Sequence, residues 1–142
     1  VENIQNLKYL RLNSMTKLED ISALGFLEDL IHLSFASCHK VNLNQNYSSL
    51  LSLQEFSMLK QKNVDSLELL STMPKLEILK IFETTIKGGS LDFLYKMPYL
   101  KALRMDSKKH YDIDVESFSK SLKAKHGDYE LDIFNILGID FF

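Results

Sequence analysis

The hydrophobic positions of this chain recur in a fixed order about every 23 residues. Five phrases of the form LxxLxLxx, with conservative replacements, begin at Leu7, Leu30, Leu53, Leu76 and Leu100. The separations are 23, 23, 23 and 24 residues, and the three apolar positions are filled in all five copies. A further apolar residue precedes each phrase by three positions, at Ile4, Leu27, Leu50, Met73 and Met97. This self-similarity predicts a stack of similar units.

Within each phrase the apolar and polar residues alternate. Leu10 and Leu12 are two residues apart, so on a strand they point to one face while Tyr9, Arg11 and Asn13 point to the other. Each phrase therefore predicts a strand with one face in a core and one face displayed. Between the strands the apolar residues are mostly three positions apart, which indicates a coil that turns inward at every third residue.

Two of the segments between strands predict short helices. Residues 66–73 and 90–97 carry apolar residues at helical spacing. Ser66 and Ser90 are N-cap neighbours, and Pro74 and Pro98 cannot continue a helix. The corresponding segment at 41–51 is rich in Asn and Ser, and we expect it to be extended or a single turn.

The five phrases and their triplet spacing resemble the leucine-rich repeats, in particular the short internalin-like and phosphatase-regulator-like class. The resemblance implies an α/β solenoid of five or six repeats, with parallel strands on the concave face and short helices or turns on the convex face. In the family, one position after each strand is normally Asn or Cys, and its side chain satisfies backbone groups of the neighbouring turn. We call it the ladder position. Here that position holds Met15, Cys38, Gln61, Thr84 and Lys108. Only Cys38 conforms, so we expect an irregular ladder with looser turns. The alternative is an ordinary α/β domain with leucine-rich strands.

The period ends after Leu100, and residues 112–142 are predicted to form a C-terminal cap. Asp114 is a candidate N-cap, and Gly127 ends the helix that follows it. Val115, Phe118 and Leu122 share one face of that helix. A solenoid end needs such a seal, because its last repeat would otherwise leave the core and a strand edge open.

The ends of the chain differ in character. Residues 129–142 are too apolar to stay exposed and have strand character, and Leu131, Phe134 and Ile136 could supply one more phrase. Val1 leads directly into the first repeat with no capping segment before it. We therefore expect the chain to be the C-terminal part of a longer protein.

Composition agrees with a single domain over residues 1–142. Lys and Arg number 17 against 19 Asp and Glu, for a net charge of −2, and the two signs are interspersed. No basic stripe is present, so neither nucleic acid nor a membrane is expected as a partner. The single Cys38 cannot form an internal disulfide, which favours a cytoplasmic location, although a segment ahead of Val1 could carry a signal peptide.

Catalytic and metal-binding patterns are not found. The four histidines, at positions 32, 39, 110 and 126, do not pair at metal-ligand spacing. Asp112, Asp114 and Glu116 lack the Gly and the distant Glu of a calcium loop. Glycine-rich phosphate loops, GxSxG turns and HExxH pairs do not occur either. We therefore expect no enzyme activity, cofactor or metal.

The displayed face of the predicted sheet supplies the candidate binding site. Residues at equal positions of successive repeats stack into columns about 4.8 Å apart. Leu59, Ile78 and Phe82 form an apolar island in these columns, flanked by basic residues. The predicted partner-binding residues on the concave face are Tyr9, Arg11, His32, Leu59, Ile78, Lys80, Phe82 and Arg104.

Two functions remain open from the sequence. The first is a non-catalytic protein–protein interaction module that holds a protein partner on the concave face, because apolar side chains inside a polar and basic rim are typical of binding hot spots. The second is a C-terminal structural or regulatory domain of a larger protein, with the concave face occupied in cis by an upstream catalytic or effector domain. The sequence indicates neither the identity of the partner nor the oligomeric state.

Overall fold

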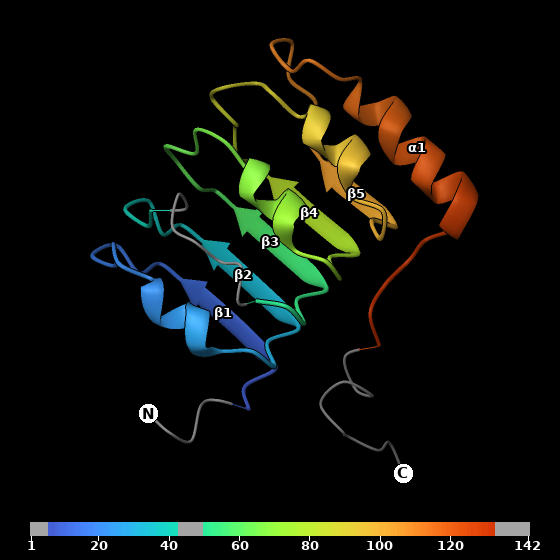
Figure 1. Ribbon diagram of the computed structural model, residues 1–142. Helices are drawn as coiled ribbons and strands as arrows, with labels where there is room; N and C mark the ends of the chain where they lie inside the picture. Colours follow the sequence, from blue (N-terminus) through green and yellow to red (C-terminus); the bar gives the residue numbers. More distant parts are fainter. Residues whose placement is uncertain (1–5, 43–49, 133–142) are drawn as a thin grey trace.

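The computed structural model describes residues 6–42 and 50–132. Its strands form one parallel sheet in which each strand pairs with the next along the chain (Figure 1). The strands are β1 (Tyr9–Asn13), β2 (His32–Ala36), β3 (Glu55–Leu59), β4 (Ile78–Phe82) and β5 (Ala102–Met105). This is the arrangement of a solenoid-like repeat, since every connection leaves one strand and returns beside it.

The register of the sheet follows the sequence repeat. Leu33 of β2 lies between Leu10 of β1 and Phe56 of β3, and Leu79 of β4 lies between Phe56 and Leu103 of β5. Each residue therefore pairs with its equivalent in the next repeat. The columns predicted from the sequence are confirmed by this register.

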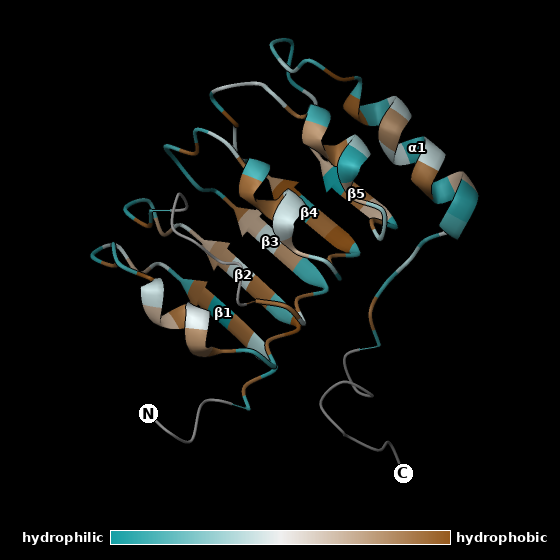
Figure 2. Ribbon diagram, in the orientation of Figure 1, coloured by the Kyte–Doolittle hydropathy of each residue, from teal (hydrophilic) through white to brown (hydrophobic). Residues whose placement is uncertain are grey.

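The core lies on one face of the sheet. The opening leucines of repeats two to five, Leu30, Leu53, Leu76 and Leu100, are all buried, and Leu7 packs against the core with part of its surface exposed. Figure 2 shows hydrophobic and hydrophilic residues alternating along the strands. One set of alternate positions fills the core, and the other set forms what we call the noncore face, the face predicted to be concave.

Short 3₁₀ helices lie on the core side of the sheet (Figure 1). They are η2 (Ser22–Phe26), η3 (Glu68–Thr72) and η4 (Asp92–Lys96). The helices predicted within 66–73 and 90–97 are therefore confirmed, whereas η2 was not predicted as a helix. Pro74 and Pro98 follow η3 and η4, as expected from their inability to continue a helix. Much of the 41–51 segment, residues 43–49, lies outside the described part of the chain.

A left-handed residue follows each of the first four strands. Ser14, Ser37, Lys60 and Glu83 have φ angles of 56°, 54°, 52° and 49°. The amide of each of the first three continues the ladder into the next repeat, for example from Ser14 N to Ala36 O at 2.8 Å. The same unfavourable conformation therefore recurs every 23 residues because the sharp turn off the sheet requires it.

In the central repeats, Gln61 and Thr84 occupy the ladder position, and their side chains form hydrogen bonds with backbone groups. Gln61 is buried and accepts a hydrogen bond from the Cys38 amide at 2.5 Å while donating to the Cys38 carbonyl at 2.8 Å. Thr84 in turn accepts from the Gln61 amide at 3.1 Å. The looser turns expected here are not seen between Cys38 and Thr84, because amide and hydroxyl groups satisfy the buried backbone equally well.

At the last turn, the backbone of the preceding repeat is bound by side chains that follow the ladder position in the sequence. Lys108 is exposed, and instead the Tyr111 hydroxyl accepts from the Ile86 amide at 3.1 Å while His110 Nε2 lies 2.8 Å from the Ile86 carbonyl. Gly89, with φ +70°, lies against this turn, and a Cβ there would be 2.5 Å from the His110 carbonyl oxygen. Only glycine combines this φ angle with this close approach.

The predicted C-terminal helix is present as α1 (Val115–His126). The Asp114 carboxylate accepts a hydrogen bond from the Ser117 amide at 3.0 Å, and Gly127 at φ +72° ends the helix. Val115 is buried, and α1 lies beside β5, where the Ser119 hydroxyl donates to the Leu103 carbonyl at 2.6 Å (Figure 1).

The additional strand expected within 129–142 is not found in residues 129–132, which have no regular secondary structure. The rest of that prediction, including Phe134 and Ile136, lies outside the described residues. Within the described ranges 6–42 and 50–132, no helix is long and apolar enough to cross a membrane.

Candidate functional site

The predicted binding residues all lie on the noncore face, but their exposure differs. Arg11, Leu59 and Phe82 are exposed, whereas Tyr9, Lys80 and Arg104 are half-buried. His32 and Ile78 are buried. The predicted site is therefore split into an exposed part and a covered part.

The covered part is the column nearest the start of the strands. It consists of His32, Glu55, Ile78 and Ala102, which pair with one another in register and are all under 9% exposed. Ile78 has no exposed surface, although it lies outside the hydrophobic core cluster on the opposite face. The prediction that Ile78 is available to a partner is wrong, because the noncore face is covered at this column.

Buried charged and polar groups line up along this part of the face. The ring of His32 stacks on Tyr9 at 4.1 Å between centroids, and its Nδ1 contacts Oε2 of Glu55. The other carboxylate oxygen of Glu55 lies 3.2 Å from Nζ of Lys80. Burial alone would raise the pKa of Glu55, but the hydrogen bond and charge of His32, with those of Lys80, hold it below its ordinary value. Glu55 is therefore an anion at neutral pH.

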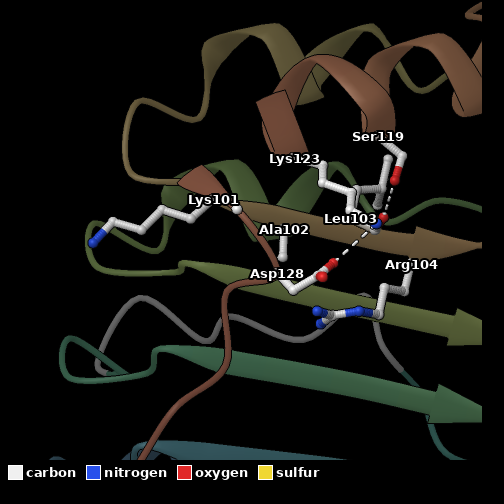
Figure 3. Close-up of a pocket in the computed structure, with 8 residues that line it drawn as sticks. Lys101, Ala102, Leu103, Arg104, Ser119, Lys123 and Asp128 are labelled. Atoms are coloured by element: carbon white, nitrogen blue, oxygen red, sulfur yellow. Dashed lines mark hydrogen bonds and ion pairs between the residues drawn. The ribbon is translucent and has the colours of Figure 1, made fainter. Parts of the chain in front are cut away.

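The chain returns to the noncore face after α1. We call residues 128–132, Asp-Tyr-Glu-Leu-Asp, the crossing segment. Figure 3 shows the chain after α1 passing across the strands, with Asp128 beside Lys123 of the helix. Asp128 and Lys123 form an ion pair at 3.2 Å, which fixes the start of the segment.

Glu130 of the crossing segment bridges two neighbouring strands. One carboxylate oxygen lies 3.2 Å from Nζ of Lys80 on β4, and the other lies 3.2 Å from an Arg104 nitrogen on β5. The same guanidinium donates to the Tyr129 carbonyl at 3.0 Å. Two of the three basic residues predicted to form the rim are thus already held by the chain itself.

Next to this bridge, Tyr129 contacts the residues that immediately precede β4 and β5. Its hydroxyl donates to the Glu77 carboxylate, and Nζ of Lys101 lies 4.6 Å from the centre of its ring. Burial, followed by the hydrogen bond to Glu77 and its negative charge, raises the pKa of Tyr129 to about 12. The neutral phenol is the form that this contact holds.

We expect a spectrophotometric titration to show a late transition from Tyr129. Because the folded pKa is raised, the contact of Tyr129 is fully present below about pH 10, the ordinary tyrosine value, and is lost as the pH rises through about 12. The Tyr129→Phe variant should lose this late transition. Identical titration curves for wild type and Tyr129→Phe above about pH 11 would contradict the contact.

The exposed part of the face contains Arg11 and two apolar side chains. Leu59 and Phe82 pair in register on β3 and β4 and are 37% and 38% exposed, which makes them unusual among the large apolar side chains of the strands. A hollow of about 550 Å³ opens beside Phe82, between β5 and α1. Its lining includes Arg104, Met105 and Lys120. The Leu59–Phe82 pair therefore adjoins a hollow of mixed lining, with Leu103 and Val115 among its apolar residues and Glu116 beside the two basic ones.

Sequence reasoning did not identify Glu55, Tyr129 and Glu130 as parts of the site. Glu55 occupies a displayed column, so its position was predicted but its partners were not. A signal for the crossing segment was present, because its three carboxylates in five residues complement the basic column of Lys80 and Arg104. Residues 129 and 130 contact Arg104 and Lys80, which are 25 and 50 positions earlier in the sequence. A local sequence pattern cannot indicate a contact between segments so far apart.

In the described part of the chain, no group of three or more His, Cys, Asp or Glu side chains could hold a metal ion. Cys38, the single cysteine of the chain, is buried, and its thiol donates to backbone carbonyls. In comparisons with known proteins, no protein-family model matches this chain and no curated protein matches it significantly.

Proposed function

We propose that this chain is a leucine-rich-repeat module that binds a protein partner, without catalysis, on the concave side of its sheet. The observation that supports this most directly is the exposed Leu59–Phe82 pair at equivalent positions of adjacent repeats. Apolar side chains that stay exposed beside basic groups are typical of the centre and rim of a binding surface.

The repeat assignment rests on three independent regularities. The opening leucines of repeats two to five are buried, the register advances by one repeat per strand, and a left-handed residue follows each of the first four strands. In this proposal α1 is the C-terminal cap, because Val115, Phe118 and Leu122 pack on the core at the end of the sheet. The buried free thiol of Cys38 agrees with a cytoplasmic location.

The second candidate function is a regulatory domain whose concave face is filled in cis. The contacts of Tyr129 and Glu130 favour cis occupation of part of the face. They come from a segment downstream of the repeats, whereas the sequence analysis expected an upstream domain. The Leu59–Phe82 pair is left exposed by them, so a site for a partner in trans remains.

The test compares two aspartate substitutions at exposed phenylalanines. Phe82 lies on the noncore face, whereas Phe26 of η2 is 76% exposed on the helix side. We expect wild type and Phe26→Asp to retain the same proteins from a native lysate and Phe82→Asp to lose them, because a buried aromatic anchor typically contributes about 2 kcal/mol or more. Quantitative mass spectrometry of the three pull-downs is the measurement.

The control also locates an alternative surface. Loss of the retained proteins with Phe26→Asp alone would place the interface on the 3₁₀ helices, where Tyr95 is also exposed. Equal retention by all three baits would contradict the noncore face as the interface. Leu67 and Leu91, at the starts of η3 and η4, are buried and could not serve that alternative surface.

A further inference from the structure

The crossing segment shows which chemistry the noncore face accepts. Three of its five residues are acidic, and Glu130 places one carboxylate between cations of β4 and β5. Tyr129, one residue earlier, places a phenol between Glu77 and Lys101. The face therefore has two adjoining subsites, one for a carboxylate and one for an aromatic ring with a hydroxyl donor.

The two cations of the carboxylate subsite differ in their other partners. Lys80 also pairs with Glu55 of the sheet, at 3.2 Å. In contrast, the contacts seen for the Arg104 side chain are with Glu130 and the Tyr129 carbonyl. Its second terminal nitrogen, Nη1, is buried and has no hydrogen-bond partner among the described residues. A half-buried guanidinium of this kind favours a carboxylate from outside the sheet.

The segment that supplies this carboxylate is held on the sheet through the side chains of Glu77, Lys80, Lys101 and Arg104. Residues 128–132 form no secondary structure, and the Glu130 side chain is 56% exposed. Ion pairs at such exposure contribute little to stability. A ligand joined to its site by a short connection occupies it because its effective concentration is high, about millimolar for a flexible link. Such an occupant can be replaced by a ligand in trans that makes the same contacts and adds others.

We propose that the strip formed by Glu77, Lys80, Lys101 and Arg104 binds an extended peptide segment with an aromatic–acidic pair in its protein partner, and that the crossing segment competes with it in cis. This inference rests on the proposed function, since it names the chemistry of the partner for the same face. A peptide seated there would continue toward Phe82, which lines the same hollow as Arg104.

The aromatic subsite distinguishes a peptide from a simple anion. Glu77 accepts a hydrogen bond from the phenol, and Glu55 adds a second negative charge close to Lys80. These carboxylates would repel a phosphate backbone, whereas a tyrosine hydroxyl satisfies Glu77. The combination selects a ring with a donor next to a carboxylate.

The test uses the full chain and a peptide copy of its own segment. The probe is a fluorescent peptide of residues 127–132, Gly-Asp-Tyr-Glu-Leu-Asp, with blocked ends. Fluorescence anisotropy compares wild type with Glu130→Gln, which keeps the shape of the side chain and removes its charge. We expect the Glu130→Gln protein to bind the probe about tenfold more tightly, because its own segment competes less well.

Three controls assign the effect. A probe with Gln in place of its Glu should bind both proteins weakly. Adding Arg104→Ala to the Glu130→Gln protein should remove binding, whereas adding Lys17→Ala should leave it unchanged, since Lys17 is exposed in the turn after β1, at the other end of the sheet from β5. Circular dichroism checks that each variant is folded. If Arg104→Ala does not fold, Arg104→Met, which keeps a long side chain and removes the charge, replaces it.

The results separate this inference from the proposed function. Equal binding of the probe by wild type and Glu130→Gln, or binding that survives the Arg104 substitution, would overturn the acidic-peptide strip. The proposed function would still stand if Phe82→Asp lost its partner in the pull-down. Conversely, the probe could bind in a manner that depends on Arg104 while Phe82→Asp still retains its partner. That result would support the peptide-binding strip and contradict the Leu59–Phe82 pair as the interface.

Discussion

Replacing Leu79 by alanine is expected to lower the free energy of unfolding by about 2 to 5 kcal/mol. Leu79 is 1% exposed and lies in the core between Phe56 and Leu103 of the neighbouring strands. Removing its side chain leaves a cavity shared by three repeats, which the fixed spacing of the strands prevents from closing. Urea unfolding followed by circular dichroism measures the loss.

Phe82→Ala is the matched control for this prediction. Phe82 is on the same strand as Leu79 but faces the other side and is 38% exposed. We expect it to cost about 1 kcal/mol or less, as is typical of surface substitutions. Equal losses for the two variants would show that the faces of β4 are assigned wrongly.

Gln61→Leu is expected to destabilise the chain by about 2 kcal/mol or more, although leucine nearly conserves the volume. The Gln61 side chain is the partner of both the amide and the carbonyl of Cys38, and all these groups are buried. Without it, the Cys38 amide remains buried and unpaired, which costs about 1 to 3 kcal/mol, and the Cys38 carbonyl keeps only its hydrogen bond from the Val41 amide at 3.2 Å.

Thermal and urea unfolding of Gln61→Leu and Lys62→Ala provide the measurement. Lys62 is the exposed neighbour of Gln61 on the same turn, so its substitution should change stability little. If Gln61→Leu is as stable as wild type, the ladder between Cys38 and Thr84 does not hold the turns together. A loss confined to Gln61→Leu would show that the Gln61 amide group satisfies the buried backbone of this turn.

The sequence by itself determined the repeat and the register of the sheet. The period of 23 residues places Leu33, Phe56 and Leu79 at equivalent positions, and the structure pairs them in that order. This could be predicted because burial of alternate residues on a strand is a local pattern, and stacked copies repeat it. The short helices before Pro74 and Pro98, and α1 between Asp114 and Gly127, were predictable from end signals for the same reason.

Only the tertiary structure decided what the noncore face presents. Ile78 was placed in the correct column but is buried, and Lys80 and Arg104 were placed in the basic rim but are held by Glu130. A strand pattern states which way a side chain points, whereas its exposure depends on which distant segment lies over it. The contact between Glu130 and the strands joins residues 50 positions apart at Lys80, and ion pairs of this kind follow no sequence spacing. Long-range charge complementarity could therefore be found only in the folded chain.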